Sequence, residues 1–130
     1  MVKDVTIQDD SKIDVYGLII FPDEFTWPSG AGDAPTSGIN SPNLAWTSVP
    51  EYTVAQFEAL EGAGVVFLPA AGGRNGLNVT LVGRYGRYWS STSINEFNAK
   101  YLYFNNTSFD PDGSSSRGDG RSVRLVSVVQ

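Results

Sequence analysis

The sequence predicts a small α+β or mostly β domain, on three observations. One segment has the periodicity and capping residues of a helix, several short segments are rich in β-branched and aromatic residues, and one long stretch is rich in Pro, Gly and Ser. A chain of 130 residues is long enough for one hydrophobic core and short for two. We therefore expect a single domain over residues 1–130, with one main helix, several short antiparallel strands and long ordered loops.

The chain begins with a predicted strand and a long loop. Residues 13–21 (IDVYGLIIF) are β-branched and aromatic, which is typical of a buried strand. Residues 22–50 are rich in turn-forming residues but also contain Trp27 and Trp46, which a flexible linker would not need. This loop should therefore be ordered and held to the core by its tryptophans.

The predicted helix lies in the segment TVAQFEALEGAG. Thr53 and Gln56 have the spacing of a capping box, and a glycine follows the last apolar position. The apolar residues repeat at helical spacing on one face, which we expect to be buried: Val54, Phe57 and Leu60.

Everything after the helix predicts strands and turns. The strand candidates are residues 65–70 (VVFLPA), 79–82 (VTLV), 99–105 (AKYLYFN) and 121–129 (RSVRLVSVV), with the last expected to pair centrally. In the third of these, alternation places Leu102 and Phe104 on the core face and two tyrosines on the exposed face. We expect the large ring of Trp89 to be in the core as well.

Composition excludes several function classes. The chain has no histidine and no cysteine, which removes Ser-His-Asp and Cys-His nucleophilic sites, disulfides and His-ligated zinc. A net charge of −5 and a pI near 4.5, with no basic stripe, argue against nucleic acid and membrane surfaces as partners. We expect neither a signal peptide nor a membrane span in the chain.

Two short motifs are compatible with chemistry but are weak. The sequence DPDG at residues 110–113 has two carboxylates, which favours an acidic turn over a calcium loop because the further oxygen ligands are missing. The same carboxylates leave open a glycoside hydrolase. The RGD triplet at residues 117–119 is a tripeptide that integrins bind, and three residues often recur by chance.

The stretch RYWSSTSINEFNAKYLYFNN at residues 87–106 combines aromatic rings with serines and asparagines. Tyrosine offers a large, rigid contact area, and Ser and Asn offer adaptable hydrogen-bonding groups. This is the mixture that antibody paratopes use. It indicates recognition of a ligand in preference to catalysis.

The chain also resembles a known family from about Tyr16 to Val126. The segments that carry the resemblance are GLIIFPD (17–23), YTVAQFEALEGAGVVFLPAAG (52–72), YGRYWSSTS (85–93), NAKYLYFN (98–105) and SVR (122–124). They resemble the Fibrobacter-type major paralogous domain, which occurs in many copies in genomes of gut bacteria. The resemblance implies a C-type lectin-like fold, shared with formylglycine-generating enzymes and with the variable proteins of diversity-generating retroelements.

Two departures limit what the resemblance implies. Sugar-binding C-type lectins have carboxylates in their calcium motifs, whereas this chain has Ser41-Pro42-Asn43 and Trp89-Ser90-Ser91. Formylglycine-generating enzymes need cysteines, which are absent. We therefore expect no metal, no cofactor and no enzymatic activity.

The resemblance implies a variable region over about residues 89–124, in which template mutagenesis changes the ligand-binding residues while Glu96 and Lys100 stay constant. The expected ligand-binding residues are Ile94, Asn95, Phe97, Asn98, Tyr101, Tyr103, Asn105, Asn106, Ser108, Asp110, Asp112, Ser114, Ser115 and Ser116. The ligand would be a protein or a glycan. The module would belong to a larger protein at a cell surface or a phage surface; the alternative is a carbohydrate-binding or adhesin domain of fixed specificity.

Overall fold

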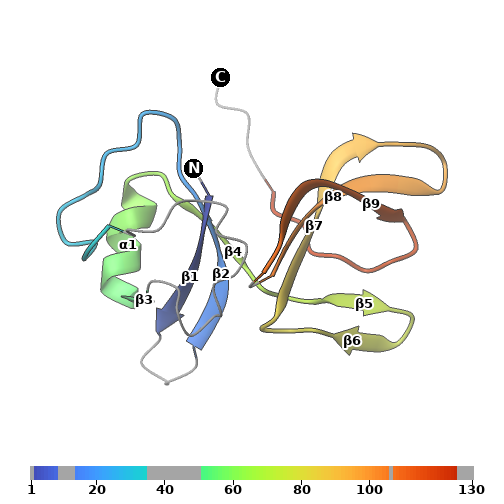
Figure 1. Ribbon diagram of the computed structural model, residues 1–130, viewed down its shortest axis with the longest axis horizontal. Helices are drawn as coiled ribbons and strands as arrows, with labels where there is room; N and C mark the ends of the chain where they lie inside the picture. The colour runs from blue at the N-terminus through green and yellow to red at the C-terminus, as the bar shows by residue number, and fades with distance from the viewer. Residues whose placement is uncertain (1, 9–13, 35–50, 106, 126–130) are drawn as a thin grey trace.

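The computed structural model of the chain describes residues 2–8, 14–34, 51–105 and 107–125 (Figure 1). The described elements are β1 (Val2–Gln8), β2 (Asp14–Ile20), β3 (Glu51–Thr53), α1 (Val54–Gly62), β4 (Val66–Pro69), β5 (Gly73–Asn75), β6 (Asn78–Thr80), β7 (Tyr85–Ser93), β8 (Asn98–Asn105) and β9 (Phe109–Ser116). They form sheets with the strand orders β3-β1-β2-β4, β5-β6 and β7-β8-β9. The pairs are antiparallel except for β1 with β3. The α+β class is confirmed.

The four-stranded sheet is the middle layer of the fold, with α1 on one side and the β7-β8-β9 sheet on the other (Figure 1). Alternation along β2 sends Ile19 toward the helix and Leu18 toward the second sheet. The helix-side cluster consists of Ile19, Phe21, Ala31, Tyr52, Phe57, Leu60 and Val65. The cluster between the sheets consists of Leu18, Leu68, Ala70, Tyr88 and Phe104.

Helix α1 begins at the predicted capping box. The backbone N–H of Gln56 donates to Thr53 Oγ1 at 3.3 Å, and the backbone N–H of Thr53 donates to Gln56 Oε1 at 2.9 Å. Two free amide groups of the first turn are thereby satisfied. Phe57 and Leu60 are buried as predicted, but Val54 is exposed because the core contact starts one turn later.

The β7-β8 pair is positioned by a close contact of backbone and ring. Gly86 faces Phe104 across the two strands, and a Cβ on Gly86 would lie 2.0 Å from the Phe104 ring. Only glycine therefore allows Phe104 to reach full burial. Tyr88 packs beside it, and its hydroxyl donates to the backbone oxygen of Pro69 at 2.7 Å.

Several element predictions were wrong or incomplete. Strands β1 and β9 were not predicted, because both contain charged or turn-forming residues and gain their order from pairing with a neighbouring strand. The strand predicted at residues 79–82 is replaced by β6, which ends at Thr80. Of residues 121–129, the described part joins β7 only through a bridge at Ser122, and Val123 and Leu125 are exposed.

The loop after β2 is held to the core by aromatic contacts, as predicted for Trp27. Its ring packs against Tyr52 at 6.2 Å and Phe25 at 5.9 Å between centroids, and its indole N–H donates to the backbone oxygen of Gly32 at 2.8 Å. Trp46, the Ser41-Pro42-Asn43 motif and Asn106 lie outside the described residues.

Candidate functional site

The outer face of the β7-β8 pair carries aromatic and arginine side chains in register. Tyr85 is paired with Asn105, Arg87 with Tyr103, and Trp89 with Tyr101. The ring centroids are 5.6 Å apart for Tyr85 and Tyr103 and 6.1 Å apart for Trp89 and Tyr101. We call this surface the arginine–aromatic face; it consists of Tyr85, Arg87, Trp89, Tyr101, Tyr103 and Arg121.

The predicted core position of Trp89 was wrong. Tyr88 points into the core between the sheets, and Trp89, the next residue along the strand, must therefore project from the opposite face. Trp89, Tyr101 and Tyr103 are all half-buried, so the two tyrosines are less exposed than the sequence predicted. The alternation in YGRYW was the signal for this arrangement. It places Gly86 and Tyr88 on the face that packs against the core and Tyr85, Arg87 and Trp89 on the opposite face.

Arg121 is the centre of one half of this face. Its guanidinium carbon lies 3.9 Å from the Tyr101 ring centroid and 5.0 Å from that of Trp89. Its Nη2 pairs with Asp119 Oδ2 at 3.0 Å, and its side chain is only 5% exposed. Burial lowers the pKa of Arg121, whereas Tyr101 and Asp119 oppose the shift. Sequence reasoning missed Arg121, since it follows β9 and meets β8 only in the fold.

Arg87 is the centre of the other half. Its guanidinium carbon lies 5.6 Å from the Tyr85 ring centroid and 5.8 Å from that of Tyr103. Desolvation raises the pKa of Tyr103, and Tyr85 adds to this effect, while the positive charge of Arg87 opposes it. The two halves are electrostatically linked, because Arg87 also lowers the pKa of Arg121.

The turn between β7 and β8, residues 94–97, is an ordered tip that we call the hairpin tip. Asn95 Oδ1 accepts hydrogen bonds from the backbone N–H groups of Phe97 at 2.9 Å and Asn98 at 2.8 Å. Arg117, which follows β9, donates from its backbone N–H to the Phe97 oxygen at 2.9 Å and from its guanidinium to Ser93 Oγ. These contacts fix the backbone of the tip.

The side chains of the hairpin tip are directed to solvent. Phe97 is 68% exposed and Ile94 is 45% exposed. A fixed backbone that displays large apolar side chains binds a partner with little further ordering cost. The hairpin tip therefore presents two large apolar side chains on an ordered backbone.

Strand β9 adds a polar edge with a bulge. Leu102 on β8 lies opposite two residues of β9, because Tyr101 pairs with Gly113 and Tyr103 pairs with Asp110. A Cβ on Gly113 would lie 3.0 Å from the Tyr101 ring, so glycine allows this ring to cover the β9 backbone.

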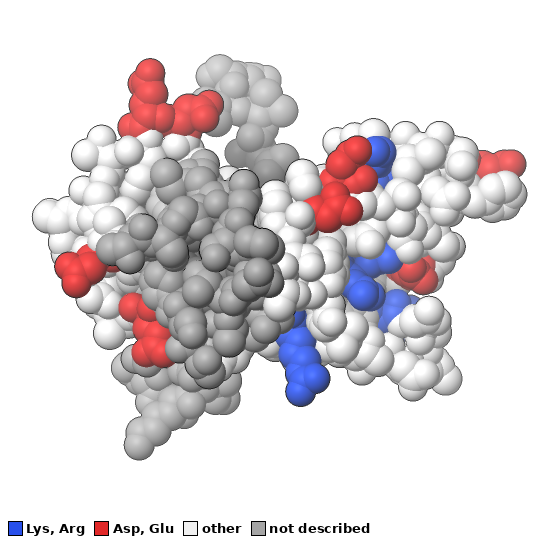
Figure 2. Space-filling view, in the orientation of Figure 1, with Lys and Arg blue, Asp and Glu red and all other residues white. Residues whose placement is uncertain are grey.

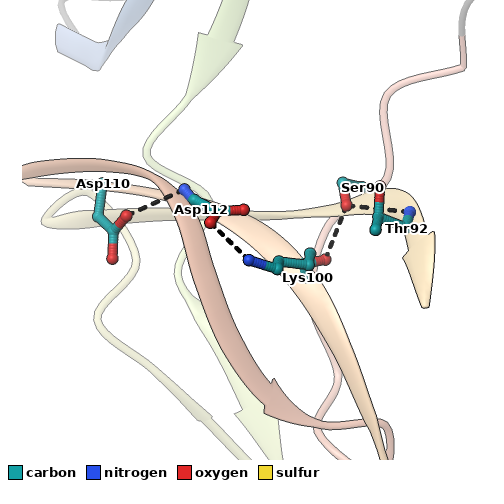
Figure 3. Close-up of polar contacts among 5 residues, drawn as sticks. All are labelled: Ser90, Thr92, Lys100, Asp110 and Asp112. Carbon is teal, nitrogen blue, oxygen red and sulfur yellow. Dashed lines mark hydrogen bonds and ion pairs between the residues drawn. The ribbon is translucent and has the colours of Figure 1, made fainter. Parts of the chain in front are cut away.

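The two carboxylates of DPDG have local structural partners (Figure 3). Asp110 Oδ1 accepts from the Asp112 backbone N–H at 2.9 Å, and Asp112 Oδ2 pairs with Lys100 Nζ. In the same view the Ser90 hydroxyl donates to the backbone oxygen of Lys100 at 3.2 Å. Both carboxylates are exposed, and the prediction of a turn at residues 110–113 is replaced by the bulged strand.

The structure also bears on a possible metal site and on the RGD triplet at residues 117–119. Within the described part of the chain, no group of three or more Asp, Glu, His or Cys side chains could hold a metal ion. The Arg117 guanidinium contacts Ser93 and the Asn98 oxygen, and Asp119 accepts from Arg121 and from the Ser115 hydroxyl at 2.8 Å. Both charged side chains of the triplet therefore have intramolecular partners.

The predicted ligand-binding residues divide into three sets. Exposed positions are Ile94, Asn95, Phe97, Ser108, Asp110, Asp112, Ser114 and Ser116. Half-buried positions are Asn98, Tyr101, Tyr103 and Ser115. Asn105 was predicted to face a partner, but it is buried; its Oδ1 accepts from the Thr107 and Ser108 backbone N–H groups, and its Nδ2 donates to the Tyr103 hydroxyl at 2.6 Å.

Taken together, the fold and this surface define a small α+β domain whose three-stranded sheet carries aromatic and arginine side chains on its outer face. Residues 40–126, more than half of the chain, match the family model described as Domain of unknown function (DUF8237), and the chain belongs to that family. No curated protein and no solved structure matches the chain. Among the described residues, no helix has the length and apolar character needed to cross a membrane.

Proposed function

We propose that the chain is a non-enzymatic recognition module in which a C-type lectin-like scaffold presents the hairpin tip and strand β9 to a protein or glycan ligand. The observation that carries the proposal is the exposed Phe97 on a backbone fixed by Asn95 and Arg117. Aromatic anchors on a preorganised backbone are typical of binding hot spots. Within the described residues, helix α1 and the mostly antiparallel strands are compatible with such a scaffold.

The structure supports a smaller set of contact residues than the sequence predicted, because some of the predicted residues stabilise the sheet. Tyr101 is enclosed by Trp89, Arg121 and Gly113, so a change at Tyr101 would disturb the packing of the sheet. Ile94, Phe97 and the exposed positions of β9 have no such constraint, whereas Asn95 holds the backbone of the hairpin tip. In the diversification proposal, we therefore expect variation at Ile94, Phe97, Asp110, Asp112, Ser114 and Ser116, and invariant Asn95 and Tyr101.

Sequencing of the coding region in sibling isolates tests diversification. Substitutions should cluster at the exposed positions of residues 94–116, beside a near-copy of this region and a reverse transcriptase. An even spread of substitutions along the gene would contradict diversification. Identical sequences at the hairpin tip in all isolates would favour an adhesin of fixed specificity instead.

Binding itself is tested with Phe97→Ser on glycan and protein arrays. Removal of an exposed ring should leave folding unchanged and weaken binding to the array ligands by about tenfold or more, as for a hot-spot residue. Val79→Ser is the matched control, since Val79 is 65% exposed on β6, away from the hairpin tip. Equal binding by both variants and the wild-type chain would exclude the hairpin tip as the contact point.

A further inference from the structure

Arg87 is a partly enclosed cation whose charge has no carboxylate partner within the described part of the chain. The ion pairs there join Lys100 to Asp112 and Arg121 to Asp119. Arg87 is half-buried between the rings of Tyr85 and Tyr103, and its Nε is buried without a hydrogen-bond acceptor among the described residues. Arg121 also contacts two aromatic rings and also has a buried Nε without an acceptor, but it has a counter-ion in Asp119, which Arg87 lacks.

The surrounding charge also favours an anionic ligand. Among described residues 15–73, the charged side chains are all acidic: Asp23, Glu24, Asp33, Glu51, Glu58 and Glu61. Residues 74–125 contain seven Lys or Arg and four Asp or Glu. In Figure 2, blue atoms accordingly appear only over the β5–β9 side of the molecule. The long-range field would therefore orient an anion toward the sheet that carries Arg87.

A half-buried guanidinium gains more from an anion than an exposed one. Removal from water weakens its hydration, and the ring contacts hold its plane in place before a ligand arrives. A carboxylate can then accept two parallel hydrogen bonds from the guanidinium, which are about twice as strong as neutral ones. The Nε is buried and out of reach of a ligand, so the two donors of such a pair would be the terminal Nη1 and Nη2 groups.

The position of Arg87 on a sheet face distinguishes between classes of acidic ligand. An extended peptide is usually bound at a sheet edge, where backbone groups pair with its main chain. A sheet face offers only side chains, here tyrosine rings and hydroxyls beside the arginine. Those groups suit a sugar ring, whose C–H face stacks on an aromatic ring and whose hydroxyls bond to side chains.

We propose that Arg87 binds the carboxylate of an acidic sugar, with Tyr85 and Tyr103 contacting the ring that carries it. The inference rests on the proposed recognition function and specifies its ligand as a glycan that carries a carboxylated sugar. Arg87 is the group that distinguishes the acidic sugar from its neutral counterpart.

The experiment is calorimetric titration of the full chain with oligogalacturonate, a glucuronate-containing oligosaccharide and a sialylated oligosaccharide. At least one acidic sugar should bind, and its carboxyl-reduced, neutral form should bind about tenfold more weakly or worse, as expected for loss of a hydrogen-bonded charge pair. Arg87→Gln should cause a loss of similar size. Arg84→Gln is the matched control, because it removes the same charge from an exposed turn and should change affinity less than about twofold.

Further arms make each outcome decisive. Arg87→Lys keeps the charge but loses the planar pair of donors, so its loss should be intermediate; circular dichroism of each variant checks folding. Absence of binding to all three acidic sugars, or equal affinity for the neutral forms, would overturn the inference. Arg87-dependent binding of poly-glutamate in place of the sugars would assign the site to acidic peptides. Array binding that Phe97→Ser abolishes and Arg87→Gln leaves intact would preserve the recognition function while removing this site.

Discussion

The two sides of the four-stranded sheet are packed with different kinds of side chains. On the helix side, Phe57, Leu60 and Ile19 form an apolar core that is closed by Phe21 and Tyr52. On the far side, the β7-β8-β9 sheet buries Phe104 and Tyr88 on its inner face but covers its outer face with arginines between aromatic rings. The first region buries its apolar side chains between the helix and the sheet, whereas the second carries arginine and tyrosine side chains on its outer face.

The comparison shows how, within the described part of the chain, the outer face of the β7-β8-β9 sheet is ordered by contacts between its own side chains and Arg121. Arg121 lies against the rings of Trp89 and Tyr101 and is neutralised by Asp119, so it acts as the covering layer there. Long cationic side chains can bury apolar surface in this way while their charge remains paired. Arg87 has the same kind of ring contacts without the carboxylate, and it is consequently the place where the face is chemically incomplete.

The largest expected effect concerns the contact that joins the two regions. Phe104→Ala should lower the free energy of unfolding by about 3–5 kcal/mol, since Phe104 is 0% exposed and lies between the sheets. Urea denaturation followed by tryptophan fluorescence and circular dichroism measures the change. A loss below about 1 kcal/mol would mean that the sheets do not depend on this contact. Gly86→Ala, which would drive a Cβ into the same ring, should also destabilise the chain.

A second effect belongs to the helix-side core. Burial raises the pKa of the Tyr52 hydroxyl from 10.0 to about 12, and Asp33 adds to the shift. Because the folded-state pKa exceeds the unfolded value, this stabilisation is complete below pH 10 and is lost as the pH rises toward 12. The loss should be roughly 2–3 kcal/mol between these limits. Unfolding free energies at pH 9 and pH 11.5 measure it, and Tyr52→Phe should reduce the pH dependence; an unchanged profile in that variant would exclude Tyr52 as the cause.

A smaller effect is expected on the outer face. Arg121→Met should lower the free energy of unfolding by about 1–2 kcal/mol, because it removes two cation–π contacts and the partner of Asp119 but keeps an apolar stem. Thermal or urea denaturation at low and high salt measures the loss. Arg84→Met is the control at an exposed position. Equal stability of both variants and the wild-type chain would show that the arginine–aromatic face does not stabilise the sheet.

Local signals in the sequence were sufficient for the elements whose order is local. Thr53 and Gln56 predicted the start of α1, and the alternation in residues 99–105 placed Leu102 and Phe104 on the core side of β8. Strand β9 could not be predicted from FDPDGSSS, since its residues favour turns and its order comes from pairing with β8. Asn105 was predicted to be a contact residue because asparagine is common both in turns and in ligand-binding surfaces. The sequence alone does not distinguish these two roles.

The sequence by itself determined the α+β class, helix α1 with its cap, the core face of β8 and the absence of histidine and cysteine chemistry, because these follow from composition and short-range periodicity. Only the tertiary structure decided which aromatic residues of β7 are in the core, that Arg121 covers Tyr101, and that Arg117 holds the hairpin tip. The two arginine contacts join residues that are 20 positions apart, and the arrangement of β7 depends on which strand face meets the core. No local pattern encodes a partner at such a separation.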